Sequence, residues 1–154
     1  MPHDNSTPRA IQRFEVSLKA AIIRDGRLLL LREADTGYWE LPGGRIDVGE
    51  ERKAQHDVLV REIAEELGAS VQVTVDAMAV TWVRQRLIDG IYQLIVARPC
   101  WFIAGTIALS AEHADARWTT PHDWPGLTFP PLSDYHDGLQ RLWSAIGTIP
   151  HRSR

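Results

Sequence analysis

Apolar residues follow two different periods along the chain, and these periods separate the predicted strands from the predicted helices. Short apolar or alternating runs, some of them joined by Asp-Gly turns, predict β-strands. The predicted strands are residues 14–24, 27–32, 38–41, 71–84, 91–104, 106–109 and 117–120, with a loop over 111–115. Apolar residues at helical spacing predict a helix over 51–67, which Gly68 ends, and a second helix that Ser133 caps and that runs to about Ile146.

The order of these elements predicts an α/β fold of the α+β type. One helix falls among the strands and one follows them, which favours a mixed β-sheet covered on both faces. A doubly wound parallel fold is not expected, because too many neighbouring strands are joined as hairpins. A Gly-x-Gly-x-x-Gly sequence, which marks the dinucleotide-binding version of that fold, does not follow any predicted strand.

The length of 154 residues suits one domain with a single core, expected over residues 14–149, with tails at 1–13 and 150–154. Apolar runs stay shorter than the roughly 18 residues of a membrane span, and residues 1–13 are too polar for a secretory signal. The single cysteine, Cys100, excludes an internal disulfide, so a cytoplasmic location is expected. A net charge of −3 argues against a general binder of polymeric nucleic acid.

Negative charge is concentrated in one segment of the chain. Residues 40–68 hold eight acidic and four basic side chains, so this segment carries −4 while the rest of the chain carries +1. Within it, Glu62, Glu65 and Glu66 share one face of the predicted helix, opposite its apolar residues. Their i, i+3, i+4 spacing makes the three carboxylates neighbours that repel one another, unless a basic residue such as Arg61 neutralises part of the charge.

The residues alone leave two interpretations of this acidic face open. It is either a solvated helix surface or a site for a hard divalent cation, since Mg²⁺ binds one or two carboxylates and keeps substrate phosphates among its other ligands. The upstream segment Pro42-Gly43-Gly44 favours the cation, because bare backbone there can approach a metal or a phosphate and offer a carbonyl oxygen. The same segment also fits an ordinary turn.

These residues resemble the signature of the Nudix hydrolases, G-x5-E-x7-R-E-U-x-E-E-x-G-U, in which U is a bulky aliphatic residue. Gly44 and Glu50 match the first part, and residues 61–68, R-E-I-A-E-E-L-G, match the second. The W-E-L-P-G that precedes Gly44, the hairpin of the first two strands and the acidic loop with Glu112 are also similar to that family. The resemblance covers about residues 14–146.

Two positions depart from the signature. Ten residues rather than seven separate Glu50 from Arg61, and Ala69 is small where a larger aliphatic residue is usual. The three additional residues predict either a longer first helical turn or a bulged loop, and they leave open whether Glu50 reaches Arg61. The glutamate triplet follows the insertion, so its spacing is intact. Gly44, Glu50 and Gly68 are expected to maintain the geometry of the motif.

The resemblance implies an α/β/α sandwich around the mixed sheet. It also implies a hydrolase that cleaves the diphosphate linkage of a nucleoside diphosphate joined to another moiety. In that family pattern Glu62, Glu65 and Glu66 would hold Mg²⁺ or Mn²⁺, assisted by the carbonyl of Gly43 or Gly44. Glu62 would also act in catalysis, and Gly43 would also contact the substrate.

Further roles follow from the same resemblance. Arg61 would hold the helix carboxylates in place and belongs to the expected catalytic residues. Glu112 would be a further metal ligand or the general base, with an exposed loop acid as the alternative. Arg32 and Arg45 would contact phosphate, with ordinary surface arginines as the alternative. His113 is expected to be structural or exposed rather than catalytic.

The expected substrate is a small nucleotide, and the oligomeric state, a homodimer included, is left open. Tyr38, Trp82, Tyr92 and Trp101 either stack on a base or pack in the sheet, and packing is the preferred interpretation. The alternative function is a Nudix-fold nucleotide-binding or regulatory module without turnover, in which the insertion has spoiled the site. A third interpretation is a structural domain with an acidic helix. The complete R-E-x-x-E-E block favours the enzyme.

Overall fold

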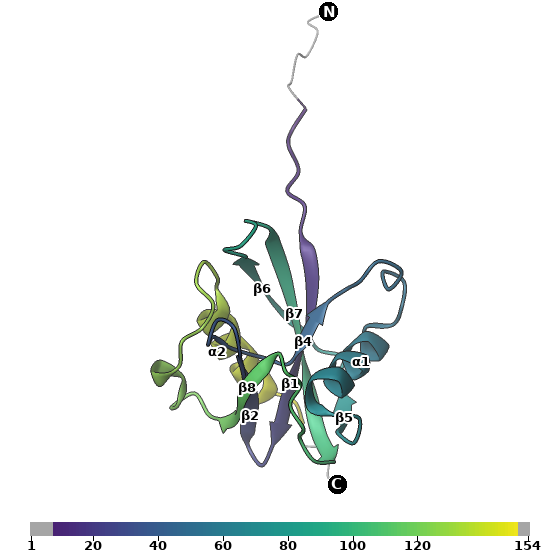
Figure 1. Cartoon of the computed structure of the whole chain (residues 1–154), viewed down its shortest axis with the longest axis vertical. Helices are drawn as coiled ribbons and strands as arrows, with labels where there is room; N and C mark the ends of the chain where they lie inside the picture. Colours follow the sequence, from purple (N-terminus) through teal and green to yellow (C-terminus); the bar gives the residue numbers. More distant parts are fainter. Residues whose placement is uncertain (1–7, 151–154) are drawn as a thin grey trace, which may run out of the picture.

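One mixed sheet runs through the computed structural model, which describes residues 8–150 (Figure 1). Within this range the strands are β1 (Glu15–Arg24), β2 (Arg27–Glu33), β3 (Trp39–Glu40), β4 (Gly43–Arg45), β5 (Gln72–Val75), β6 (Val80–Gln85), β7 (Tyr92–Ala104) and β8 (His113–Thr119). The helices are α1 (Gln55–Leu67) and α2 (Tyr135–Ile146), and a short 3-10 turn spans Trp124–Gly126.

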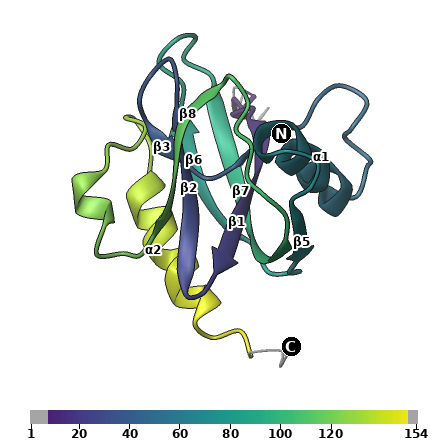
Figure 2. The same cartoon turned by 60° about the horizontal axis from the view of Figure 1, so that its bottom comes forward.

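The central strands of the sheet are β1 and β7, which lie side by side and parallel (Figure 2). Their register runs from Glu15 opposite Gln93 to Ile23 opposite Trp101. The order is β3-β2-β1-β7-β5, and β4, β8 and β6 pair with β1, β2 and β7 respectively. Each of these other pairs is antiparallel. The mixed α+β fold predicted from the sequence is therefore confirmed.

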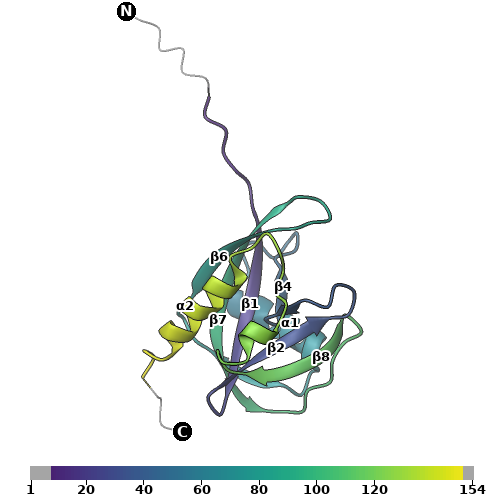
Figure 3. The same cartoon turned by 90° about the vertical axis from the view of Figure 1, so that its left-hand side faces the viewer.

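The two helices cover opposite faces of the sheet, and each face has its own apolar cluster (Figure 3). Alternate residues of β1 belong to the two clusters, with Leu18 and Ile22 on the α1 side and Ala21 and Ile23 on the α2 side. The α1 side is mainly aliphatic and includes Leu29, Leu31, Leu59, Ile63 and Leu67. The α2 side is rich in aromatic residues and includes Trp39, Trp82, Trp124 and Tyr135. Trp82 is thus a core residue, as the preferred interpretation had it.

The predicted strand 71–84 is wrong as a single element, because β5 and β6 are separate. Asp76 makes the break, since its carboxylate accepts a hydrogen bond from the Met78 N–H at 2.9 Å. The predicted strand 106–109 is also wrong. There the N–H groups of Ala108 and Ser110 donate to carbonyls in the last turn of α1, those of Leu67 at 2.8 Å and Glu66 at 3.0 Å. This segment therefore satisfies the end of the helix instead of joining the sheet.

Three predicted boundaries are wrong as well. The first helix begins at Gln55 rather than at residue 51, because residues 51–54 form a turn. Strand β8 begins at His113, inside the predicted loop 111–115. The N-cap of α2 is Asp134 rather than Ser133, whose hydroxyl donates to the Pro130 carbonyl at 2.6 Å.

The predicted tails fall largely outside the described range. Residues 1–7 and 151–154 lie outside it, and residues 8–14 belong to no helix or strand. Within the described range, neither helix has the length and apolar character needed to cross a membrane.

Candidate active site

Two glycines of β4 bring the backbone close to both β1 and α1. Gly43 has a φ of +128°, and a Cβ on it would collide with the Leu18 carbonyl oxygen. A Cβ on Gly44 would lie 2.6 Å from the Glu62 carboxylate. Only glycine permits both the backbone angle and these approaches. The segment is therefore a strand pressed between two elements rather than a simple turn.

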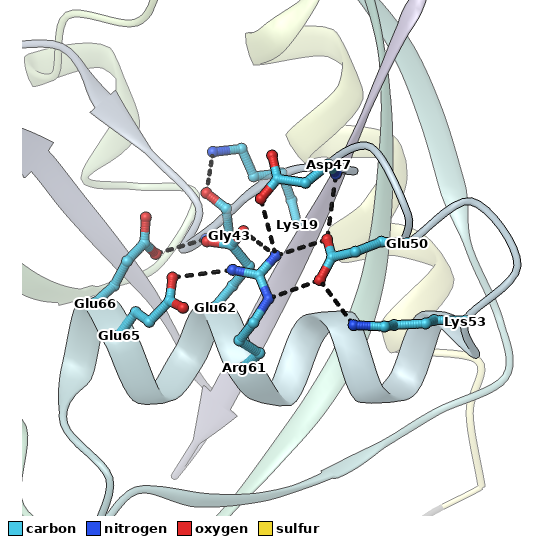
Figure 4. A network of polar contacts seen from close by, with 9 residues as sticks. All are labelled: Lys19, Gly43, Asp47, Glu50, Lys53, Arg61, Glu62, Glu65 and Glu66. Carbon is cyan, nitrogen blue, oxygen red and sulfur yellow. Dashed lines mark hydrogen bonds and ion pairs between the residues drawn. The ribbon is translucent and has the colours of Figure 1, made fainter.

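Arg61 joins three carboxylates into one network, named here the Arg61 cluster: Arg61, Glu50, Glu62 and Glu65 (Figure 4). The guanidinium binds both oxygens of Glu50, at 3.0 and 2.9 Å. It also donates to Glu62 at 2.9 Å and to Glu65 at 3.0 Å. Lys53, 3.6 Å from Glu50, and Asp47, 4.0 Å from Arg61, add one charge of each sign at the edge of this cluster. The carboxylates therefore still outnumber the cations, and the cluster carries an excess of negative charge.

The three additional residues before the helix do not separate Glu50 from Arg61. They are absorbed in the turn over residues 51–54, where the Lys53 N–H donates to the Glu50 carbonyl at 2.9 Å. The bidentate bond from Arg61 lowers the pKa of Glu50, and the N–H of Asp47 lowers it further. The insertion thus forms a bulged loop, and it leaves the motif contact in place.

The surroundings of one helix carboxylate, Glu62, oppose its ionisation. Burial raises the pKa of Glu62, and the neighbouring charges of Glu66 and Glu65 raise it further, while Arg61 acts in the opposite direction. The pKa of Arg61 is raised, chiefly by its hydrogen bonds to Glu50. The acidic face is therefore under electrostatic stress that an additional cation would relieve.

Glu66 faces a different group of residues from the rest of the triplet. One carboxylate oxygen accepts the Gly43 N–H at 2.7 Å, and the other lies 3.1 Å from the His113 Nε2. Glu66, Glu112 and His113 each offer a ligand atom, and these atoms lie within 4.8 Å of one another. The imidazole of His113 is only 8% exposed; apart from the close contact of Nε2 with Glu66, its nitrogens have no polar partner among the described residues. A buried imidazole in this state is suited to bind a ligand beside Glu66.

The structure thus divides the predicted metal ligands. Glu62, Glu65 and Glu66 project from one face of α1, but Glu62 and Glu65 pair with Arg61, and the Glu65 side chain is 59% exposed. Glu66 alone joins Glu112 and His113. His113, predicted from the sequence to be structural or exposed, is a buried side chain on β8, where strand pairing places it opposite Glu33 of β2. Its position next to Glu112 was the available signal.

Glu66, Glu112 and His113 lie along a cleft of about 830 Å³, which Glu62 and Glu65 do not line. The part of the cleft named here the acidic end is lined by Glu66, Glu112 and His113, together with Gly43 and Gly44. The cleft is also lined by Tyr38 and Arg45. The Arg45 guanidinium donates to the Glu15 carboxylate at 2.9 Å. The other two aromatic candidates for base stacking, Tyr92 and Trp101, do not line this cleft. Arg32 is likewise not a lining residue, and Gly68 lies at the end of α1 beside Ala108.

A second ion network forms the floor of the same cleft. It is named here the Glu40 cluster: Glu40, Lys19 and Arg84. The Glu40 carboxylate, 3% exposed, pairs with Lys19 at 3.3 Å and with the Arg84 guanidinium. The Lys19 ammonium also donates to the Gly43 carbonyl at 3.0 Å (Figure 4). Gly43 therefore connects Glu66 with the Glu40 cluster, because its N–H donates to Glu66 and its carbonyl accepts from Lys19.

Strand β3 holds Glu40 in place through contacts with the C-terminal part of the chain. The Leu41 N–H donates to the Tyr135 hydroxyl at 2.7 Å, and the Trp39 N–H donates to the Thr128 carbonyl at 2.9 Å. Burial raises the pKa of Tyr135 well above its usual value, and the charge of Glu40 raises it further. Lys19 and Arg84 are site residues that the sequence did not reveal. They come close to each other only because β1 and β6 both pair with β7.

Comparisons with known proteins agree with this architecture. Residues 16–137 match the NUDIX domain family. A MutT-like protein of Streptomyces ambofaciens is 36% identical over 109 residues, which span 70% of this chain but 65% of that relative's length, just under two thirds. The CTP pyrophosphohydrolase of Escherichia coli (strain K12) is 32% identical over 116 residues, 70% of this chain and 78% of that protein. The crystal structure of a UDP-X diphosphatase superposes with a TM-score of 0.72 at 18% identity, covering 90% of this chain and 66% of that chain, and shows the fold alone.

Proposed function

The chain belongs to the NUDIX family, and on that premise we propose that it hydrolyses the diphosphate linkage of a small nucleotide with the help of a divalent cation. One observation carries the proposal. The Glu66 carboxylate is held by the Gly43 N–H at 2.7 Å and faces Glu112 and His113 inside an open cleft. This arrangement offers anionic oxygens at a place that a diphosphate can reach only if a cation neutralises the charge.

The residues of the acidic end fit a divalent cation. The ligand atoms of Glu66, Glu112 and His113 lie within 4.8 Å of one another, and the buried imidazole has no polar partner besides Glu66 in the described part of the chain. Glu62 and Glu65 stand beside them on α1 as further ligands. Carboxylate oxygens suit Mg²⁺ and Mn²⁺. When bound, such an ion supplies charge neutralisation of the phosphates and a more acidic water.

The chain's own residues supply positioning and proton transfer. Arg61 fixes the orientation of Glu62 and Glu65 relative to Glu50 through its hydrogen bonds. The N–H of Gly43 orients the Glu66 carboxylate. We assign Glu112, exposed at the mouth of the cleft, either to the ligand set or to the general base that takes a proton from the attacking water. The phosphate contact of Arg45 is supported by its place on the cleft wall, whereas Arg32 has no such support.

Further parts of the proposal rest on the sequence. We assign residues 14–149 to one domain, because the family match over 16–137 takes up most of that range. A cytoplasmic location rests on the single cysteine, Cys100, which is buried. The alternative, a binding module without turnover, requires that the insertion spoils the site, and the bidentate contact between Glu50 and Arg61 supports the enzyme instead.

The test is a hydrolysis assay across dinucleotides, nucleotide sugars and nucleoside triphosphates, with Mg²⁺, with Mn²⁺ and with a chelator. We expect phosphate-containing products from at least one of these classes only when a metal is present. Thermal unfolding with each nucleotide runs in parallel. Stabilisation by a nucleotide without turnover in either metal would contradict the enzyme and support the binding module.

A further inference from the structure

The Glu40 cluster contains more positive than negative charge. Two cations, Lys19 and Arg84, share one carboxylate, and the three side chains are 10%, 17% and 4% exposed. Removal of charges from water is costly unless each is compensated. One positive charge is therefore left over in the Glu40 cluster. Among the described residues, neither Lys19 nor Arg84 forms a hydrogen bond with Glu66 or Glu112.

Hydrogen-bond donors in the cluster also exceed the acceptors. An ammonium has three donors and a guanidinium five. Lys19 donates to Glu40 and to the Gly43 carbonyl, and Arg84 makes a single hydrogen bond, to Glu40, within the described residues. Gln93 lines the same cleft at 5% exposure, and its side-chain amide adds a further pair of donors. The floor therefore presents unused donors to the cleft.

We propose that Lys19 and Arg84 form a second phosphate-binding subsite, which takes a phosphoryl group that the acidic end does not hold. Phosphate oxygens are anionic acceptors without donors, and they match both the charge and the donors of this floor. Two further cations, Arg45 and Arg86, line the same cleft. Both pair with Glu15, at 2.9 and 3.8 Å, and Arg86 also pairs with Asp89 at 3.3 Å. The edge of a nucleobase would satisfy some donors but would leave the positive charge uncompensated.

The subsite predicts a preference among substrates, and this part rests on the proposed function. A nucleoside triphosphate carries a charged phosphoryl group beyond the cleaved linkage, whereas a nucleoside diphosphate sugar carries a neutral group there. We expect the floor to favour the triphosphate. Phosphate binding itself does not depend on turnover, so it can be measured separately.

The direct test uses inorganic tripolyphosphate as the probe, with a chelator present and calorimetry as the readout. Without metal the acidic end repels the probe, so binding reports on the cationic floor. We expect Lys19→Met and Arg84→Met to weaken binding about tenfold or more, because hydrogen bonds to charged groups are lost. Lys19→Arg retains the charge and should retain binding. Arg141→Met is the matched control, since Arg141 bonds to Asp137 and the Thr81 carbonyl outside the cleft.

The expected result is binding by the unaltered protein and by Arg141→Met, with weaker binding by both floor variants. Absence of binding by the unaltered protein, or equal affinity in all variants, would overturn the subsite. Thermal unfolding confirms that each variant is folded, and Arg84→Met decides the question if Lys19→Met does not fold. The two substitutions affect different strands, so a shared loss of binding is not explained by one local distortion.

A kinetic comparison then tests the substrate preference in the presence of Mg²⁺ or Mn²⁺. The substrates are a nucleoside triphosphate and a nucleoside diphosphate sugar with the same base. The floor variants should raise the KM for the triphosphate about tenfold and change that for the sugar nucleotide little. Equal losses for both substrates would contradict the preference. If the unaltered protein hydrolyses neither, the proposed function fails, while calorimetry still decides whether the phosphate subsite exists.

Discussion

The two ion networks on either side of Gly43 have opposite compositions. In the Arg61 cluster one cation is shared by three carboxylates, and in the Glu40 cluster one carboxylate is shared by two cations. Gly43 lies between the two, with its N–H on Glu66 and its carbonyl on Lys19. The Arg61 cluster leaves an excess of negative charge on α1, whereas the Glu40 cluster leaves an excess of positive charge in the cleft. The opposite excesses of charge support the two proposed sites, a cation site beside Glu66 and a phosphate subsite at Lys19 and Arg84, which a metal-bound polyphosphate would fill together.

The largest expected effect is on the acidic end. Glu66→Gln should reduce hydrolysis about a hundredfold or more, because a neutral amide replaces the one helix carboxylate that faces both Glu112 and His113. The measurement is metal-dependent turnover with the preferred substrate, together with thermal unfolding to show an intact fold. Asp57→Asn is the matched control, since its carboxylate lies on the same helix and is 71% exposed. Unchanged activity in Glu66→Gln would refute the role of this carboxylate.

Arg61→Met should have the next largest effect and should act on stability. It leaves Glu50 and Glu62, whose side chains are 9% and 12% exposed, without their shared cation. We expect a loss of about 2–3 kcal/mol in the free energy of unfolding, or a fall of roughly 5–10 °C in Tm. Mg²⁺ should restore more stability to this variant than to the unaltered protein, as measured by denaturant unfolding with and without the ion. An equal response to Mg²⁺ in both proteins would contradict an excess of negative charge in the Arg61 cluster.

Glu40→Gln tests the other network in the opposite sense. It keeps the shape of the side chain but leaves Lys19 and Arg84 unneutralised, so we expect a loss of about 1–2 kcal/mol. Tripolyphosphate should restore this loss and should bind more tightly than to the unaltered protein, because the competing carboxylate charge is gone. Mg²⁺ should not restore it. Weaker binding of tripolyphosphate by a folded Glu40→Gln protein would contradict an anion site on the floor.

The smallest effect is expected at a carboxylate with no share in either network. Asp123 accepts hydrogen bonds from the N–H and the hydroxyl of Thr120, at 2.7 and 3.0 Å, and these lower its pKa in the folded protein. A lowered pKa means that its contribution is present above the unfolded-state value and is lost as the pH falls through the folded-state value. Asp123→Asn should therefore cost a little stability at neutral pH and nothing in strong acid. Its effect should be the same with Mg²⁺ or tripolyphosphate, and a ligand-dependent effect would show that the two networks are not separate from the rest of the surface.

Local chemistry made part of this site predictable. The spacing of Glu62, Glu65 and Glu66 placed them on one face of a helix that does form, and the glycine pair marked a close backbone approach that Gly43 and Gly44 do make. Helical geometry and glycine's freedom depend on neighbours only a few residues away. The same local reasoning failed for residues 106–109, since a short apolar run fits a strand as well as it fits a segment that satisfies the end of α1.

The sequence by itself determined the mixed α+β fold, the acidic helix and the family. Only the tertiary structure decided that Glu66 faces His113, that the insertion leaves Glu50 on Arg61, and that Lys19 and Arg84 meet at Glu40. The physical reason is the range of the interactions. Periodicity is written within one element, whereas these contacts join residues 11 to 47 positions apart, and strand pairing and register, which no single segment encodes, bring them together.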